Sequence, residues 1–443
     1  MDSVVVLGLG ITGMSCVRHL REMGVAVTVM DSRRAPPMLD VCTSEYPEVE
    51  VRTGRFDSGQ LERAHRIVVS PGLVGECIVE ELRARNAPLT SDLDLFVEAT
   101  TAPIIGITGT NGKSTVTAMV ERVLGGIGRR AIAGGNIGRP MLELLHENAE
   151  LYVLELSSFQ LALARSLQCE VATVLNVSPD HIDRHGSYQS YARAKQRIYE
   201  GARNCVFNRG DELTEPSEKG VAISFGLDAP ADGDFGVVEH DRAQWLACGN
   251  EALAATSTLP LRGAHNVENM LAALALGSAA GADIGAMIEA LAGFEGLPHR
   301  CELVGRIAGV DYLNDSKATN VGACAAALRG IGTGGRNVLL IAGGQGKGAD
   351  FSPLRDVVGM VVRTLLLIGD DGDLLEQALG HVVPTLRCHD LEDAFARAHV
   401  LAEPGDTVLL SPACASFDMF DDFEHRGECF RVLVLDLAKD SAT

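Results

Sequence analysis

Three short apolar runs lie in the first ninety residues of the chain, at residues 4–7, 25–30 and 67–69. The first run leads into G-L-G-I-T-G, which begins at Gly8, and a helical pattern of apolar residues then extends from about Met14 to Met23. The second run ends at Asp31, about twenty positions beyond the glycine turn. Strand, glycine turn, helix and strand in this order predict a small doubly wound parallel sheet that ends near Ser91.

A second α/β pattern begins with the apolar run at residues 103–107, which leads into G-I-T-G-T-N-G-K-S-T at Gly106. Apolar residues at positions 116, 119, 120 and 123 then share one face of a predicted helix. Strand, glycine turn, Lys-Ser and helix form the layout that cradles a polyphosphate. In it, Lys113 supplies a point charge and the hydroxyl of Ser114 a ligand for Mg²⁺. The match is imperfect, because Ile107 stands where a glycine is expected; the alternative is an ordinary glycine-rich turn.

The pattern continues as α/β through the rest of the chain. Apolar runs predict strands at residues 152–154, 171–175, 311–313, 338–341, 364–368 and 407–410. Residues 211–260 are rich in Gly, Asp and Pro, and predict short strands and turns, followed by a helix at about 267–280. Gly296-Leu297-Pro298 interrupts the pattern. We therefore predict a three-domain α/β protein, with domains at residues 1–91, 92–296 and 297–443.

Composition narrows the class of protein. The 443 residues are too many for one core. The net charge of −21 argues against partners such as nucleic acid or an anionic membrane. Eleven cysteines, an odd number without any C-x-x-C pair, favour reduced thiols in a cytoplasm. No apolar run is long enough to span a bilayer, and the start Met-Asp-Ser lacks the basic residues of a signal peptide. We expect a cytoplasmic protein that binds small molecules.

Polar residues follow the predicted strands, where ligands of open α/β sheets bind. Glu155 comes directly after a strand and is suited to hold Mg²⁺ or orient a water, or else faces solvent. His181 lies beyond the next strand between Asp180 and Asp183; it is either a ligand of Mg²⁺ or Mn²⁺, or a capping or surface residue. For Lys195, the residues alone favour a basic helix face.

The last third of the chain offers three further polar strand ends, at residues 314–320, 343–347 and 411–416. Their Lys, Thr and Ser side chains suit an anion such as a carboxylate. A phosphate loop next to a carboxylate site suggests ATP-dependent carboxylate activation: an acyl phosphate forms, and an amine then displaces phosphate.

Eight segments together carry a resemblance: I-T-G-T-N-G-K-S-T, L-E-L-S-S-F-Q-L, N-V-S-P-D-H-I-D-R-H, G-A-H-N-V-E-N, L-P-H-R, N-D-S-K-A-T-N, A-G-G-Q-G-K-G-A-D-F and S-P-A-C-A-S-F-D-M-F. On these segments, the chain resembles the Mur ligase family of peptidoglycan synthesis. The last three segments imply addition of D-glutamate to UDP-N-acetylmuramoyl-L-alanine. The resemblance implies a Rossmann-like first domain for the UDP-substrate, a central phosphate-loop domain for ATP and a Rossmann-like third domain for the amino acid, in a protein that we expect to be monomeric.

The resemblance also implies roles for single residues. The UDP-substrate would contact Ile11, Thr12, Asp31, Ser32, Arg33, Gly72, Asn136 and His181. ATP would contact Gly109, Thr110, Asn111, Gly112, Lys113, Ser114, Thr115, Asn266, Asn269, Arg300 and Asp315. D-glutamate would contact Thr319, Lys347, Ser416, Phe417 and Phe423. One Mg²⁺ would be held by Ser114 and Glu155, and a second by His181 and a carbamylated Lys195. Catalysis would depend on Lys113, His181, Lys195 and Lys317.

Four alternatives stay open at this point. Another amino-acid-adding ligase of the family and a folylpolyglutamate synthase-like amide ligase are disfavoured by S-P-A-C-A-S. The diaminopimelate- and lysine-adding ligases carry a D-N-P-type motif that this chain lacks. An NAD-dependent oxidoreductase would leave Lys113 and Glu155 unexplained. A non-catalytic ATP-binding module would not need polar residues at so many strand ends.

Overall fold

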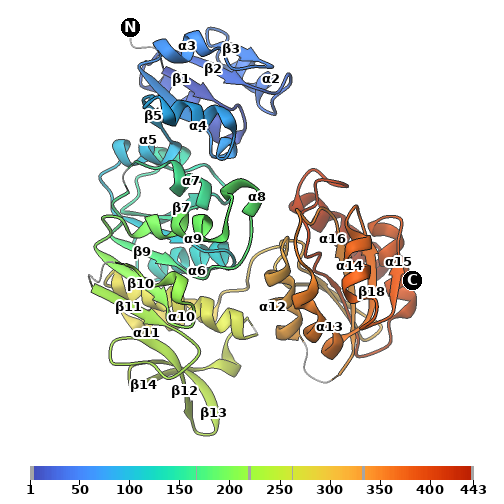
Figure 1. Ribbon diagram of the computed structural model, residues 1–443. Helices are drawn as coiled ribbons and strands as arrows, with labels where there is room; N and C mark the ends of the chain where they lie inside the picture. The colour runs from blue at the N-terminus through green and yellow to red at the C-terminus, as the bar shows by residue number, and fades with distance from the viewer. Residues whose placement is uncertain (1–3, 166, 218–220, 262, 332–334, 441–443) are drawn as a thin grey trace. The chain divides into compact units, whose positions relative to one another are not determined.

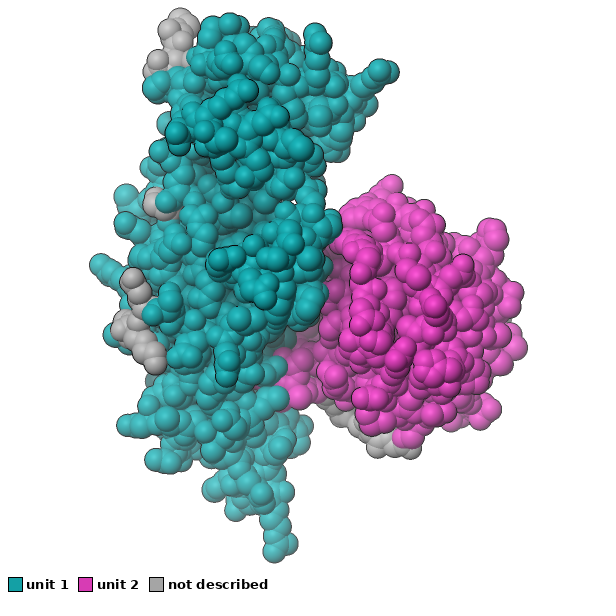
Figure 2. Space-filling model, in the orientation of Figure 1, with its two compact units in different colours: residues 1–259, 268–294 teal, residues 260–267, 295–443 magenta. Residues whose placement is uncertain are grey.

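The computed structural model describes residues 4–165, 167–217, 221–261, 263–331 and 335–440. The chain forms two compact units (Figure 2), one of residues 1–259 with 268–294 and the other of residues 260–267 with 295–443. The first unit contains two β-sheets and the second contains one (Figure 1).

The first sheet is parallel throughout, with the strand order β3-β2-β1-β4-β5. Its strands are β1 (Val4–Leu7), β2 (Val27–Asp31), β3 (Glu50–Thr53), β4 (Arg66–Val69) and β5 (Leu89–Thr90). The helices that accompany them are α1 (Ile11–Glu22), α2 (Leu39–Glu45), α3 (Ser58–Arg63), α4 (Cys77–Ala84) and α5 (Asp92–Ala99), and a 3₁₀ turn η1 (Pro71–Leu73) follows β4. The turn requires glycine at position 13, because a Cβ there would lie 1.9 Å from the carbonyl oxygen of Gly8. Helix α1 can therefore begin close to the end of β1.

The second sheet has nine strands in the order β14-β13-β12-β11-β10-β9-β6-β8-β7. Its parallel part consists of β6 (Ile104–Thr108), β7 (Ala131–Gly135), β8 (Leu151–Glu155), β9 (Val171–Val174), β10 (Asn204–Asn208) and β11 (Val221–Phe225). The antiparallel strands β12 (Phe235–His240), β13 (Ala243–Cys248) and β14 (Glu251–Ala255) extend it. Its helices are α6 (Lys113–Gly126), α7 (Ser158–Leu163), α8 (Ile182–His185), α9 (Tyr188–Gln196), α10 (Ala264–Ala279) and α11 (Ile284–Ala292), with 3₁₀ turns η2 (Met141–His146), η3 (Arg197–Tyr199), η4 (Glu212–Thr214) and η5 (Thr256–Thr258).

The sheet of the second unit has the order β15-β16-β20-β17-β18-β19 and is parallel except for β15. Its strands are β15 (Glu302–Ile307), β16 (Val310–Asn314), β17 (Val338–Gly343), β18 (Val362–Ile368), β19 (Thr385–Arg387) and β20 (Thr407–Leu410). Its helices are α12 (Val321–Ile331), α13 (Arg355–Val361), α14 (Gly372–Leu379), α15 (Leu391–Leu401) and α16 (Phe423–Asp440), and a 3₁₀ turn η6 is at Ser352–Leu354. Fully buried residues such as Leu340, Leu366 and Leu409 form the two faces of this sheet, as expected where helices cover both sides.

The α/β prediction is confirmed, with shifts at the ends of elements. Helix α1 begins at Ile11, three residues before the predicted Met14, and α10 begins at Ala264 rather than Val267. Strands β3, β5, β7, β10, β15 and β19 were not predicted, because each is short, lies at an edge or carries polar residues. All eleven cysteines are free. Among the described residues, no helix has both the length and the apolar composition needed to cross a membrane.

Candidate active site

The phosphate loop joins β6 to α6, as its sequence predicts. Gly112 caps α6 with a left-handed backbone of φ 83°, which favours glycine. A Cβ there would lie 2.5 Å from Oδ1 of Asn269 on α10, so Asn269 packs directly against the loop. Ser114 and Thr115 are buried in the first turn of α6. The backbone N–H groups of this helix start are thus presented where an anion could bind.

Residues beyond β9 hold the loop in place. The amide of Asn176 accepts a hydrogen bond from the backbone N–H of Asn111 at 2.8 Å and donates to the carbonyl of Asn111 at 3.0 Å. The backbone N–H of Thr110 donates to the carbonyl of Asn176. The backbone N–H of Ser178 donates to the Thr110 hydroxyl at 3.0 Å. The conformation of the loop is therefore set by the neighbouring strand β9 and not by its own residues alone.

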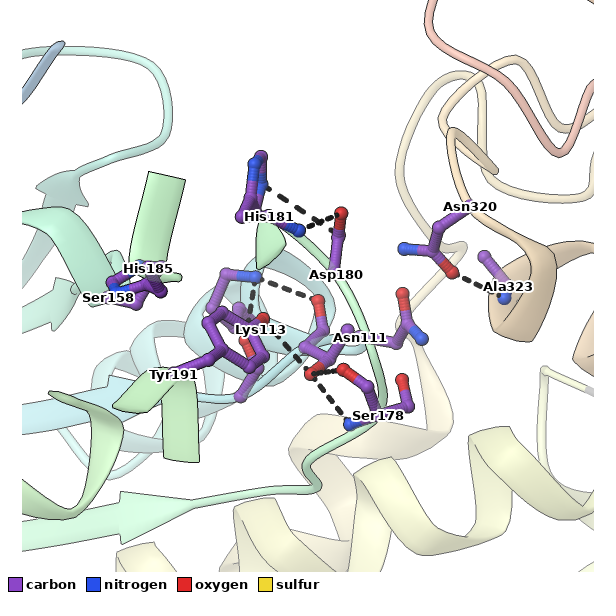
Figure 3. A network of polar contacts seen from close by, with 12 residues as sticks. Asn111, Lys113, Ser158, Ser178, Asp180, His181, His185, Tyr191, Asn320 and Ala323 are labelled. Atoms are coloured by element: carbon purple, nitrogen blue, oxygen red, sulfur yellow. Dashed lines mark hydrogen bonds and ion pairs between the residues drawn. The ribbon is translucent and has the colours of Figure 1, made fainter. Parts of the chain in front are cut away.

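Two lysine side chains donate hydrogen bonds to the phosphate loop. Nζ of Lys113 donates to the carbonyls of Gly109 and Thr110, both at 2.9 Å (Figure 3). Nζ of Lys195, on α9, donates to the same Gly109 carbonyl at 2.6 Å. Lys195 is only 2% exposed, so the structure contradicts the basic-surface interpretation that its neighbours in the sequence favoured. The reason is that α9 packs its Ala192, Ala194 and Lys195 side inward.

Burial lowers the pKa of Lys195 well below its usual value, and the positive charge of Lys113 lowers it further, while Asp180 and Glu155 act in the opposite direction. Its ammonium also lies 4.6 Å from the centre of the Tyr191 ring. The phenol of Tyr191 is 3.1 Å from the Thr110 hydroxyl. Tyr191 was not among the predicted site residues, although its position four residues before Lys195 on a helix was a usable signal.

Glu155 ends β8 and is 3% exposed, so the strand-end carboxylate lies inside the protein and not in solvent. Its Oε1 accepts a hydrogen bond from the side chain of Asn136 at 2.9 Å, and its carbonyl accepts one from the Asn136 backbone. Glu155 and Ser114 supply hard oxygen donors of the kind that Mg²⁺ prefers. Among the described residues, no group of three or more His, Cys, Asp or Glu side chains is placed so that it could hold a metal ion.

His181 caps the single-turn helix α8 in a left-handed conformation with φ 52°. Its backbone N–H donates to Asp180, and its Nε2 lies 3.8 Å from Oδ2 of the same carboxylate. Its ring packs edge-on against Phe159, with the ring centres 5.0 Å apart. His185, one turn on, stacks on Phe159 and contacts the hydroxyl of Ser158 at 2.9 Å (Figure 3). Burial, with contributions from His181 and Lys195, lowers the pKa of His185 to about 4.

The first sheet carries the predicted uridine and diphosphate residues around its glycine turn. Asp31 is buried at the end of β2, where Oδ2 accepts from the backbone of Leu9 at 2.7 Å and both oxygens accept from Arg33. Burial raises the pKa of Asp31, but these hydrogen bonds outweigh it and the pKa is lowered overall. Ile11, Ser32 and Gly72 are exposed, and Thr12 is half-buried.

In the second unit, Asp315 ends up buried after β16. The hydroxyl of Ser411 donates to its Oδ2 at 2.7 Å, and the backbone of Cys301 donates to its Oδ1 at 3.2 Å. Burial raises the pKa of Asp315 to about 6, although the charge of Arg300 acts in the opposite direction. The polar ends of β16 and β20 are thus joined directly, as the convergence of strand ends predicted.

Of the residues predicted for the amino acid, Thr319, Lys347, Ser416 and Phe417 lie on loops of the same unit, and Phe423 is the first residue of α16. Nζ of Lys317 lies 3.5 Å from the centre of the Phe423 ring. Ser416 is buried, Thr319 is half-buried, and Lys347 and Phe417 are exposed. Arg426 on α16 was not predicted; it is buried and donates to the carbonyls of Ser316 and Cys414, so it ties two of these loops together. Asn266, at the start of α10, also belongs to this unit.

The fold and the glycine loop define a multidomain α/β protein of the phosphate-loop class. Three family models match it: the Mur ligase MurD-like N-terminal domain over residues 2–88, the Mur ligase middle domain over residues 107–277 and the Mur ligase glutamate ligase domain over residues 299–414. The chain belongs to the Mur ligase family. The oxidoreductase alternative is thereby excluded.

Several curated relatives are similar over almost the whole chain. A UDP-N-acetylmuramoylalanine--D-glutamate ligase of Marinobacter nauticus is 48% identical over 97% of both chains. The ligase of the same name from Pseudomonas aeruginosa is 48% identical over 98% of both chains. The one from Legionella pneumophila is 45% identical, over 96% of this chain and 97% of its own.

Solved structures share the fold at lower sequence identity. A pseudomurein peptide ligase type C from Methanothermus fervidus has a TM-score of 0.63 at 19% identity and covers 99% of this chain and 100% of its own. The MurF ligase of Thermotoga maritima, solved in complex with ADP, has a TM-score of 0.61 at 15% identity and covers 98% of this chain and 95% of its own.

Proposed function

We propose that this protein is an ATP-dependent ligase that joins D-glutamate to UDP-N-acetylmuramoyl-L-alanine during peptidoglycan precursor synthesis. The observation that carries the proposal is the 45–48% identity, over almost the whole chain, to ligases of that name. The buried lysine and carboxylate beside the phosphate loop support it, because phosphoryl transfer depends on positioned charges.

The substrates are assigned to three domains with the boundaries 1–91, 92–296 and 297–443, and neighbouring domains share some of the contacts. The turn at Ile11 and Thr12, with Asp31, Ser32 and Arg33, binds the uridine and diphosphate. Gly72, Asn136 and His181 bind the sugar and lactoyl part. ATP binds through Gly109 to Thr115, with Asn269 and Asn266 at the adenine, Arg300 at a phosphate and Asp315 at the ribose. Thr319, Lys347, Ser416, Phe417 and Phe423 bind D-glutamate.

The first chemical step transfers a phosphoryl group. A carboxylate oxygen of the alanyl residue attacks the γ-phosphorus of ATP, the bond to the β–γ bridging oxygen breaks, and ADP leaves. Lys113 neutralises charge on the transferring group. Its ammonium gives up its hydrogen bonds to the carbonyls of Gly109 and Thr110 and donates to phosphate oxygens instead. We also assign Lys317 a place near the reacting phosphate.

The second step forms the amide. The neutral amine of D-glutamate attacks the acyl carbon, the C–O bond to phosphate breaks, and phosphate leaves as the amine loses a proton. Holding both reactants in place converts this step into an effectively unimolecular one. Exclusion of water protects the acyl phosphate from hydrolysis.

Two Mg²⁺ sites complete the proposal. When bound, the metal neutralises charge on the phosphate oxygens. Ser114 and Glu155 would hold one ion, and His181 with a carbamylated Lys195 would hold the other. An unmodified ammonium at Lys195 would repel Mg²⁺, whereas a carbamate supplies oxygen ligands. The lowered pKa of Lys195 favours the neutral amine that reacts with CO₂.

Release of inorganic phosphate from ATP tests the function. It should require UDP-N-acetylmuramoyl-L-alanine and D-glutamate together. We further expect the protein to be a monomer and to be found in the cytoplasm. Phosphate release with another amino acid in place of D-glutamate would instead favour a different amino-acid-adding ligase. Release that needs folate and glutamate would favour the folylpolyglutamate synthase-like alternative.

A further inference from the structure

Arg184, on the single-turn helix α8, joins two parts of the first unit that belong to different sheets. Its Nη2 donates to the carbonyl of Gly72 at 2.6 Å and to the carbonyl of Val74 at 2.6 Å, and its Nε donates to Val74 at 2.9 Å. Gly72 and Val74 lie in the loop that follows β4 of the first sheet. One guanidinium thus holds two carbonyls of that loop, two residues apart.

The same contact is reinforced from the side of the loop. Gly75 has φ +83°, and a Cβ there would lie 2.6 Å from the carbonyl oxygen of Arg184. Only glycine allows the loop backbone to approach α8 this closely. The guanidinium also lies 6.0 Å from the centre of the Phe159 ring, which packs edge-on against His181.

These contacts connect two predicted substrate-binding positions. Within α8, the backbone N–H groups of Arg184 and His185 both donate to the carbonyl of His181 at 3.1 Å. On the other side, a Cβ at Gly8 would lie 2.8 Å from Cβ of Ser70, so the base of the loop packs on the glycine turn of the first sheet. A continuous path of contacts therefore runs from that turn through Gly72 to His181.

We propose that Arg184 is a positioning residue that fixes His181 relative to the Gly72 loop, so that the sugar and lactoyl part of the UDP-substrate meets both at once. This inference rests on the proposed function. A planar guanidinium with several N–H donors can bind two carbonyls together, whereas lysine offers one ammonium on a flexible stem. Arg184 itself need not touch substrate.

Calorimetric titration of the full-length protein with two ligands tests this role. In the proposed function, UDP alone contacts only the first sheet, and UDP-N-acetylmuramoyl-L-alanine reaches both sides of the Arg184 contact. For Arg184→Gln, we expect binding of UDP within about twofold of wild type and binding of the complete substrate weakened about tenfold or more. Arg184→Lys should lie between Arg184→Gln and wild type.

Arg83→Gln is the matched control. Arg83 on α4 also donates across from the first sheet, to the carbonyl of Ala162 at 3.0 Å, and lines the same cavity of about 820 Å³ as Arg184. This variant should bind both ligands as wild type does. Equal weakening of UDP and the complete substrate in Arg184→Gln, unchanged binding of both, or an equal loss in Arg83→Gln would overturn the role of Arg184. Failure of the wild-type protein to bind the complete substrate would instead overturn the proposed function, and with it this role.

Discussion

The side-chain nitrogen of Lys195 lies 2.6 Å from the carbonyl oxygen of Gly109, in the phosphate loop. The two residues are 86 positions apart in the chain, and the contact is buried. A lysine in such a place is a poor structural residue, because burying an ammonium costs free energy. Its place beside the loop, together with its lowered pKa, makes it the residue on which the proposed chemistry can be tested most directly.

Lys195→Ala should lose most of the ligase activity, and Lys195→Glu, which returns a carboxylate on a shorter stem, should recover a part of it. Labelled CO₂ should add a carbamate signal to the ¹³C NMR spectrum of the wild-type protein that is absent from Lys195→Ala. A fully active alanine variant, or a spectrum without this difference, would contradict carbamylation at Lys195.

Lys113→Ala should lower kcat by about a hundredfold or more, because it removes the charge that stabilises the transferring phosphoryl group. The melting temperature should change little, since Lys113 lies at a loop–helix junction and outside the hydrophobic core. Lys439→Ala, at an exposed ion pair on α16, is the control and should keep wild-type turnover. Normal turnover of Lys113→Ala, or early melting, would show that its role is assigned wrongly.

Asp92, at the start of α5, should make stability depend on pH. It is 3% exposed, and burial raises its pKa from 3.8 to about 6 while a hydrogen bond from Gln160 partly opposes the shift. A carboxyl whose folded-state pKa is raised stabilises the fold fully below about pH 4, and this contribution is lost as the pH rises through about 6. At about 1.4 kcal/mol for each unit of pKa, the loss is on the order of 3 kcal/mol.

Asp92→Asn cannot ionise, so its urea unfolding midpoint should rise relative to wild type between pH 4 and pH 8. Asp436→Asn, an exposed carboxylate on α16, should run parallel to wild type over this range. A constant offset between Asp92→Asn and wild type at every pH would mean that Asp92 does not titrate in this window.

The proposed amino-acid site should select a dicarboxylate. Lys347, Thr319 and Ser416 offer one cation and two hydroxyl groups, and such a site rejects a substrate that lacks the second carboxylate. We expect turnover with D-glutamate and little with D-alanine, measured as phosphate release at saturating UDP-substrate. Comparable turnover of the two amino acids would refute the assignment of these three residues.

The sequence alone determined the α/β class, the phosphate loop and the positions of the strands that consist of a clear apolar run. These features depend on local patterns. An apolar run of four to eight residues, a glycine turn and a helical repeat can each be recognised within about twenty consecutive residues. The segment from Ile104 to Gly126 is an example, since strand, loop and helix lie there as predicted. The short edge strands β7 and β19 gave no such signal, because few of their residues are buried.

Only the tertiary structure decided which distant residues meet. Lys195 has the sequence neighbours of a surface lysine, and the packing of α9 against the phosphate loop buries it. The attachment of Arg184 to the loop of the first sheet, and the pairing of Asp315 with Ser411, likewise join residues about a hundred positions apart. Burial and long-range hydrogen bonds depend on how whole elements pack, and no local pattern of side chains encodes that packing.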